Sequence, residues 1–207
     1  MHPMFEQLAK VKLVPVIVIN DVKNAVPLAK ALCDGGLPCA EVTLRTPAAI
    51  EAIQAISKAV PDMLLGAGTV LTPEQVDAAT AAGAKYLVSP GLNPDTVRYA
   101  QNKGLPMLPG VCTPSEVELG LSLGLDVLKF FPAEAAGGVN MLKSLSGPYG
   151  GVKFMPTGGI SAKNLKEYLA IKSVFACGGS WMVKDDLIDS GNFAAITELT
   201  REAVNLI

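Results

Sequence analysis

Short apolar runs alternate with amphipathic stretches along the whole chain, and this alternation predicts the fold. Eight apolar runs recur at intervals of 20 to 26 residues. They begin near Val14, Cys39, Met63, Lys85, Pro106, Asp126, Val152 and Ser173. Each interval has room for a strand, a helix and two short loops. Strands that are joined by helical crossovers form a parallel sheet, so the pattern predicts an α/β fold.

Helix-start signals lie in the stretches between the runs. At four places a residue that can cap a helix stands before a proline that fits the first helical position. These places are Thr46–Pro47, Thr72–Pro73, Asn93–Pro94 and Thr113–Pro114. Thr113 and Glu116 also fit a capping box. Ile50, Ile53 and Ile56 recur at helical spacing and predict one buried helix face.

Eight strand–helix units predict a single (β/α)8 TIM barrel over residues 1–207. The units average about 26 residues (207/8), and no linker or low-complexity tract divides the chain, so we expect one domain. Residues 1–12 predict an extra N-terminal helix that caps the bottom of the barrel. An open doubly wound sheet is the alternative. It is disfavoured because GxGxxG is absent and eight evenly spaced units favour closure.

Composition narrows the classes of function. The one histidine is His2, in a terminus we expect to be frayed, which excludes a catalytic triad and histidine-ligated zinc. The net charge of −2 gives no reason to expect a nucleic-acid or membrane partner. No run approaches the roughly 20 apolar residues of a membrane helix, and the N-terminus does not resemble a signal peptide. The four cysteines form no CxxC pair and predict buried thiols in a cytoplasmic protein.

Lys129 is the most unusual residue of the predicted strands. It lies inside the sixth apolar run, on the same face as Val127 and Phe131. A lysine in such a place is costly unless it is paired or neutral, and a neutral lysine is a nucleophile. Lys129 is therefore a candidate catalytic residue. The alternative is a lysine that reaches solvent at a strand end or pairs with a buried carboxylate.

The second predicted strand carries three polar residues on one face. Glu41, Thr43 and Arg45 alternate there and would supply an acid/base, a hydroxyl and an anion-binding group. Active sites of (β/α)8 barrels lie at the C-terminal ends of the strands, so we expect these residues near Lys129. A purely structural ion pair of Glu41 with Lys129 or Arg45 is the alternative.

Glycine pairs end the last two runs, at Gly158–Gly159 and Gly178–Gly179. Glycine lets backbone N–H groups approach an anion, and the loops after strands seven and eight are the recurrent phosphate site of this fold. Ser161 is expected to cap the following helix and to add its positive end. A tight turn without a ligand is the alternative for each pair.

Six motifs in order resemble one known family. They are EVTLRT (41–46), GAGTV (66–70), SPG (89–91), KFFPAE (129–134), PTGG (156–159) and GGSW (178–181). The set resembles the 2-keto-3-deoxy-6-phosphogluconate (KDPG) aldolases, also described as 4-hydroxy-2-oxoglutarate (KHG) aldolases. The resemblance spans nearly the whole chain, from VPVIV at 14–18 to the final helix. It implies a class I, Schiff-base aldolase, a carbon–carbon lyase that needs neither a metal nor an organic cofactor.

The resemblance also implies roles for individual residues. Lys129 would form the Schiff base and Glu41 would be the general acid/base. The substrate-binding residues would be Arg45 and Thr69 at the pyruvate carboxylate, Pro90 and Phe131 along the pocket, Thr157 at the C4 stereocentre, and Gly158, Gly159, Gly179 and Ser180 at the distal phosphate. The family is typically homotrimeric and acts in the Entner–Doudoroff pathway. The small-molecule partners would be a 2-keto-3-deoxy sugar acid phosphate and pyruvate.

Other functions remain open at this stage. An aldolase for the 6-phosphogalactonate epimer is one, although Thr157 argues mildly against it. A phosphosugar epimerase or isomerase is another, but metal-dependent members of that class need histidine ligands that this chain lacks. A non-catalytic barrel that binds a phosphorylated acid is the third.

Overall fold

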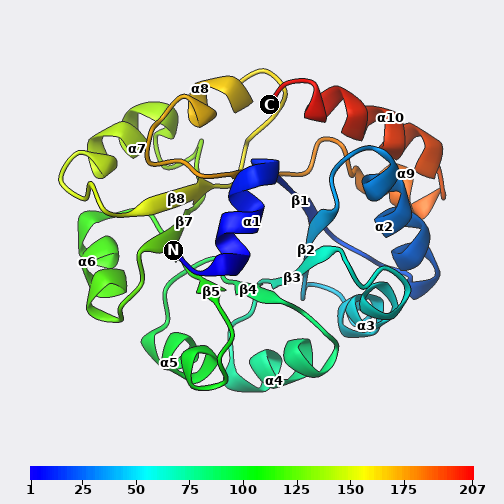
Figure 1. Ribbon diagram of the computed structural model, residues 1–207, viewed down its shortest axis with the longest axis horizontal. Helices are drawn as coiled ribbons and strands as arrows, with labels where there is room; N and C mark the ends of the chain where they lie inside the picture. The colour runs from blue at the N-terminus through cyan, green and yellow to red at the C-terminus, as the bar shows by residue number, and fades with distance from the viewer.

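The computed structural model describes residues 1–207 as parallel strands that alternate with helices (Figure 1). The strands are β1 (Leu13–Ile17), β2 (Cys39–Thr43), β3 (Leu64–Gly68), β4 (Tyr86–Val88), β5 (Met107–Leu108), β6 (Gly110–Val111), β7 (Val127–Phe130), β8 (Lys153–Pro156) and β9 (Cys177–Gly179). The helices are α1 (Pro3–Val11), η1 (Val22–Asn24, a 3-10 turn), α2 (Ala25–Asp34), α3 (Ala49–Ala59), α4 (Pro73–Ala81), α5 (Pro94–Asn102), α6 (Pro114–Ser122), α7 (Gly138–Ser146), α8 (Leu165–Leu169), α9 (Asp185–Asp189) and α10 (Phe193–Val204). The expected α/β fold with parallel strands is confirmed.

The strands form two sheets instead of one uninterrupted eight-stranded barrel. Six strands pair in the order β5-β4-β3-β2-β1-β9, and three pair in the order β6-β7-β8. The first break falls at Pro109, which has no N–H to donate and which separates β5 from β6. At the second break, only isolated bridges, Phe154 to Val174 and Thr157 to Gly178, join β8 to the segment that includes β9. The finer prediction of a complete (β/α)8 barrel is therefore not confirmed by the hydrogen bonds.

Helix α1 lies across the centre of the curled strands, with the other helices outside them (Figure 1). Its Phe5 ring packs on Tyr86, at the start of β4, with ring centroids 6.5 Å apart. The same ring packs on Phe175, just before β9, at 6.3 Å. Both contacts lie at the N-terminal ends of strands, so the predicted capping helix is confirmed. His2 is not frayed, because its Nδ1 accepts a hydrogen bond from the Met4 amide at 3.1 Å and caps this helix.

Three of the four predicted proline-linked helix caps are present. Thr72, Asn93 and Thr113 accept hydrogen bonds from the first turns of α4, α5 and α6, and Thr113 forms the capping box with Glu116. The cap at Thr46 is wrong. The Thr46 hydroxyl donates to the carbonyl of Ile19 instead, and α3 begins only after Ala48.

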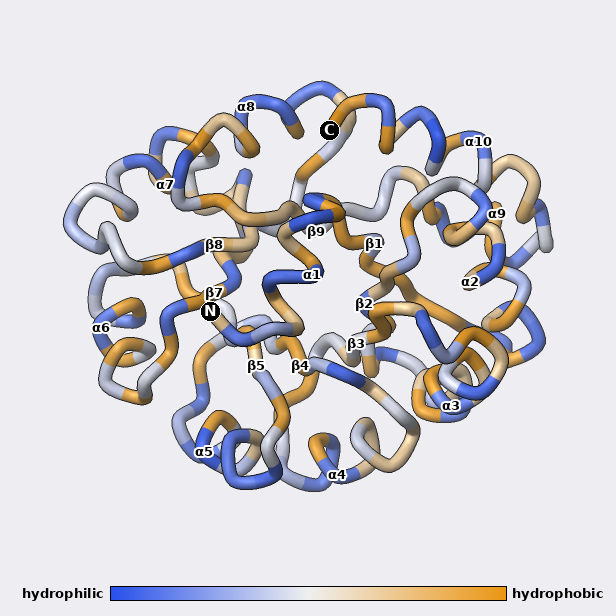
Figure 2. The backbone as a smooth tube through the Cα atoms, viewed as in Figure 1, coloured by the Kyte–Doolittle hydropathy of each residue, from blue (hydrophilic) through white to orange (hydrophobic).

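A single cluster of 58 buried hydrophobic residues lies between the sheets and the helices, so all the strands share one core. Figure 2 shows hydrophobic segments along the strands and alternating hydrophobic and hydrophilic residues in the outer helices. No helix has the length and apolar character needed to cross a membrane.

All four cysteines are free thiols. Cys39 and Cys177 are buried as expected, whereas Cys33 and Cys112 are only half-buried. Burial raises the pKa of Cys39 and raises that of Cys177 to about 12, so both keep their protons at neutral pH. Neither of the two is therefore a reactive nucleophile.

Candidate active site

Lys129 on β7 and Glu41 on β2 face each other across the interior of the molecule. The Lys129 Nζ lies 3.4 Å from Glu41 Oε1, although the residues are 88 positions apart in sequence. The side chains are 6% and 1% exposed. Strand alternation predicted that both would point inward, and the structure brings them together. A buried amine beside a buried carboxylate can exchange a proton with it without bulk water.

The second oxygen of Glu41 has no partner in the protein. Glu41 Oε2 is buried and makes no hydrogen bond. Nearly all buried polar atoms in proteins are hydrogen-bonded, so an orphaned carboxylate oxygen needs an explanation. It can accept a hydrogen bond from a substrate hydroxyl while Oε1 contacts Lys129. Phe131 covers the amine on another side, with Nζ 5.1 Å from the ring centroid.

The other two polar residues of this strand have different surroundings. The hydroxyl of Thr43 donates to the carbonyl of Ile17 at 2.9 Å, so it ties β2 to β1. The hydrogen of the Thr43 hydroxyl is therefore used between the strands. Arg45 follows the end of β2 and is exposed, with no ion pair or hydrogen bond. Its guanidinium is free to bind an anion.

A cavity of about 380 Å³ lies where β1, β2, β7, β8 and β9 end. Most of the predicted binding residues line it, namely Arg45, Phe131, Thr157, Gly158, Gly159, Gly179 and Ser180. Sequence reasoning missed Val18, Ile160 and Asp185, which also line it. Val18 and Ile160 follow β1 and β8, so their places just beyond strand ends are a signal that could have found them. Asp185 carries no such signal.

The turn at Gly158–Gly159 has the hydrogen-bonding pattern of an anion site. Both residues have left-handed backbones, with φ of 100° and 80°, which glycine adopts without strain. The carbonyls of Thr157, Gly158 and Gly159 each accept a hydrogen bond, whereas the N–H groups of Gly158 and Gly159 donate none. Successive free amides beside a cavity can bind phosphate oxygens. Thr157 adds a buried hydroxyl that also has no partner.

Ser161 does not cap a helix. Helix α8 begins four residues later, at Leu165, and has only five residues. The Ser161 hydroxyl instead accepts a long hydrogen bond, 3.4 Å, from the Lys163 amide within the loop. The expected contribution of a helix end to anion binding is therefore wrong.

Thr69 and Pro90 lie outside the cavity that holds Arg45. Thr69 follows β3, is half-buried and has a left-handed backbone with φ of 58°, which is strained for a residue with a branched side chain. Pro90 lines a neighbouring cavity of about 350 Å³ together with Leu71 and Leu92. The structure places both residues at the C-terminal ends of strands, and neither lines the cavity that holds Arg45.

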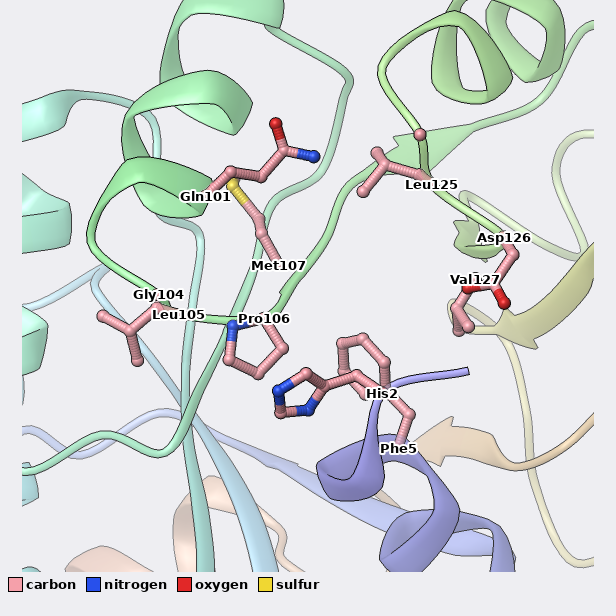
Figure 3. Close-up of a pocket in the computed structure, with 11 residues that line it drawn as sticks. His2, Phe5, Gln101, Gly104, Leu105, Pro106, Met107, Leu125, Asp126 and Val127 are labelled. Carbon is pink, nitrogen blue, oxygen red and sulfur yellow. The ribbon is translucent and has the colours of Figure 1, made fainter.

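A third cavity, of about 350 Å³, lies at the opposite ends of the strands (Figure 3). It is lined by His2 and Phe5 of the α1 region and by Pro106, Met107 and Asp126 near β5 and β7. Its one carboxylate, on Asp126, is paired with the amino group of Met1 at 2.8 Å. Because that carboxylate is already paired, this end offers no counterpart to the Lys129–Glu41 pair.

Fold and site together define an α/β protein with a buried lysine–carboxylate pair and a glycine turn whose backbone amides are free. The KDPG and KHG aldolase family model matches residues 4–199. The 2-dehydro-3-deoxy-phosphogluconate aldolase of Dickeya dadantii is 52% identical over 191 residues, which are 92% of this chain and 90% of that protein. The chain belongs to the KDPG and KHG aldolase family.

Two solved structures of similar proteins contain small molecules. The KDPG aldolase of Legionella pneumophila, with pyruvate captured at low pH as a covalent carbinolamine, has a TM-score of 0.94 and 45% identity over 97% of this chain and 98% of that one. The 2-keto-3-deoxy-6-phosphogluconate aldolase of Zymomonas mobilis, with 3-phosphoglycerate, has a TM-score of 0.92 and 44% identity over 98% and 96%.

Proposed function

We propose that this protein is a class I aldolase that cleaves KDPG to pyruvate and glyceraldehyde 3-phosphate, and KHG to pyruvate and glyoxylate. The observation that carries the proposal is the buried pair of Lys129 on β7 and Glu41 on β2, 3.4 Å apart. Family membership agrees with it. A carbinolamine, as held by the Legionella relative, is the adduct that an amine forms with a ketone before water is lost.

In the proposed reaction, the neutral amine of Lys129 attacks the C2 ketone to form a carbinolamine, whose hydroxyl takes up a proton from Glu41 and leaves as water to give a protonated imine. Glu41 then removes the proton of the C4 hydroxyl. The C3–C4 bond breaks, its electrons pass into the imine to give an enamine, and the aldehyde leaves. Glu41 returns the proton to C3, and hydrolysis of the protonated pyruvyl imine regenerates the neutral amine of Lys129 and returns a proton to Glu41. Such acid–base assistance contributes a factor of about 10²–10⁴ in rate.

Substrate binding is assigned by the chemistry of the surrounding groups. Arg45 and Thr69 would hold the pyruvate carboxylate, and Phe131 and Pro90 would line the pocket. The amides of Gly158, Gly159 and Gly179 and the Ser180 hydroxyl would bind the phosphate. Thr157 would contact the C4 hydroxyl and favour one epimer. Support comes from the free guanidinium of Arg45 and from the free amides beside it.

Five broader features belong to the same proposal. Residues 1–207 would form one domain, in which β5 and β6 are two halves of one strand interrupted at Pro109 and the bridges to Val174 and Gly178 close the barrel. The protein would be a cytoplasmic homotrimer of the Entner–Doudoroff pathway. Light scattering on the purified protein tests the trimer, and a monomeric mass would contradict it.

Trapping with pyruvate and borohydride tests the function directly. Reduction fixes the imine, and peptide mass mapping should place a reduced pyruvyl group on Lys129. Lys129→Met should abolish the adduct, whereas Lys153→Met, on the neighbouring strand β8, should retain it. An adduct elsewhere, or none, contradicts the proposal. Comparing cleavage of KDPG with its C4 epimer separates it from a 6-phosphogalactonate aldolase.

A further inference from the structure

A partly buried hydrogen bond joins α8 to the turn that follows β7. The phenol of Tyr168 donates to the carboxylate of Glu134, and Tyr168 is fully buried. Burial first, and then the bond to Glu134, raise the pKa of Tyr168. The phenol therefore keeps its proton over the physiological range and remains a donor to the carboxylate.

Glu134 in turn contacts the glycine turn of the candidate anion site. Its backbone amide donates to the Gly158 carbonyl at 3.1 Å, and the amide of Ala133 donates to the Thr157 carbonyl at 2.8 Å. A Cβ atom on Gly159 would lie 2.5 Å from Cγ of Glu134, so the side chain packs directly against the turn. The backbone bond and this contact couple the position of Glu134 to the positions of Gly158 and Gly159.

The opposite side of the turn is held by Asn164. Its Nδ2 donates to the Gly159 carbonyl at 3.0 Å, and its Oδ1 accepts from the Ser161 amide at 2.8 Å. Donors on both sides therefore occupy the carbonyls of the turn. The amides of Gly158 and Gly159 donate no hydrogen bond within the protein. Both residues line the cavity that holds Arg45.

The same bond fixes the position of a negative charge. Glu134 Oε1 lies on the Tyr168 and Gly138 side, where a Cβ on Gly138 would be 3.2 Å away, and Glu134 does not line the cavity. A carboxylate released from Tyr168 could turn toward a bound phosphate and repel it. Loss of the bond would therefore disturb the glycine turn and release the charge of Glu134. Both changes act on the distal end of the substrate, away from Lys129.

We propose that Tyr168 is a positioning residue that holds Glu134 and, through it, the amides of Gly158 and Gly159 in the arrangement that binds phosphate. The Tyr168–Glu134 bond thereby sets the preference of the enzyme for phosphorylated over unphosphorylated 2-keto acids. The inference rests on the proposed function and assigns its phosphate specificity to a pair of residues outside the cavity.

Steady-state kinetics of Tyr168→Phe on KDPG and KHG test the inference. The substitution removes one oxygen and leaves the ring in place. We expect KM for KDPG to rise about five- to tenfold, the size expected for the net contribution of one typical hydrogen bond. We expect KM and kcat for KHG to stay within about twofold, because KHG carries no phosphate. An equal loss on both substrates, or no change on either, overturns the inference.

Further variants keep the test decisive. Tyr149→Phe is the matched control, because Tyr149 also donates to a glutamate, Glu118 at 3.0 Å, far from the glycine turn. Glu134→Ala removes the bond and the charge together, so it should raise KM for KDPG but by less than Tyr168→Phe does, and the exposed position of Glu134 makes this a test even if Tyr168→Phe folds poorly. Glu134→Gln keeps an acceptor for the phenol and should remain near wild type, whereas a Gln variant as impaired as Ala overturns the role.

The inference and the proposed function fail in different ways. If the wild-type protein does not cleave KDPG, the proposed function fails. If it cleaves KDPG and the Tyr168→Phe variant has unchanged selectivity, only the assignment of Tyr168 fails.

Discussion

Gly68 on β3 leaves the space that the carboxylate of Glu41 occupies on β2. A Cβ atom on Gly68 would lie 2.3 Å from Glu41 Oε1 and 2.7 Å from its Cγ. The two residues lie on paired strands, whose register places Thr43 opposite Gly68. Since Oε1 is also the atom that contacts Lys129, the position of the acid/base depends on the absence of a side chain on the adjacent strand.

Gly68→Ala should therefore cripple catalysis by displacing Glu41. A shift of about 1 Å in a catalytic group costs on the order of 10²-fold in rate. We expect kcat on KDPG to fall by about that factor, measured by coupled release of pyruvate. Gly150→Ala is the control, because no atom lies within 4 Å of a Cβ there, and it should retain full activity. A fully active Gly68→Ala enzyme would show that the carboxylate position is unimportant.

Glu41→Gln should separate imine formation from carbon–carbon cleavage. The amide fills the same space but cannot take up the C4 proton, so turnover should fall by about 10²–10⁴. Trapping of pyruvate by borohydride should persist in part, because Lys129 keeps its amine. Thr43→Val is the control on the same strand, since the Thr43 hydroxyl only ties β2 to β1. Loss of trapping together with turnover would contradict the division of roles.

The capping box of α6 should make stability depend on pH. Burial raises the pKa of Glu116, but hydrogen bonds from Cys112 and Thr113 outweigh burial and lower it overall, below the ordinary value of 4.5. The stabilisation is therefore present above pH 4.5 and is lost as pH falls through the lower pKa of the folded state. Glu116→Gln should be destabilised in urea at pH 7, and the difference from wild type should shrink at acid pH.

Two variants check this interpretation of the capping box. Thr113→Ala should cost about 1 kcal/mol of unfolding free energy, the usual effect of losing an N-cap. Glu51→Gln, in the first turn of α3, removes a similarly placed carboxylate that caps nothing and should leave stability nearly unchanged. A destabilisation of Glu116→Gln that is the same at all pH values would assign the effect to packing.

The sequence predicted those parts of the fold that depend on local chemistry. Apolar runs and cap–proline pairs specify strands and helix starts because each acts within a few residues. Thr46 was mispredicted because a distant carbonyl, that of Ile19, competes for its hydroxyl. The break at Pro109 was not predictable from hydropathy, because proline fits an apolar run while its missing N–H interrupts the hydrogen bonds of the strand.

The lysine–carboxylate pair of the candidate site was also predictable from local patterns in the sequence. Alternation placed Lys129 and Glu41 on inward faces, and parallel strands gave them a common end. The bond of Tyr168 to Glu134 was not predictable, because it depends on where the five-residue α8 packs against a turn 34 positions earlier. No local pattern encodes such a contact.

Arg45 and Ser180 line one cavity but should differ in what they bind. Arg45→Gln removes the free guanidinium and should raise KM for KDPG and KHG alike, by about tenfold or more, because both substrates carry the C1 carboxylate. Ser180→Ala removes one hydroxyl and should raise KM for KDPG alone, by about two- to tenfold. Arg98→Gln is the control, since Arg98 is an exposed arginine on α5 that pairs only with Asp95. If Arg45→Gln impaired KDPG and spared KHG, the guanidinium would be a phosphate ligand, and the carboxylate would need another partner.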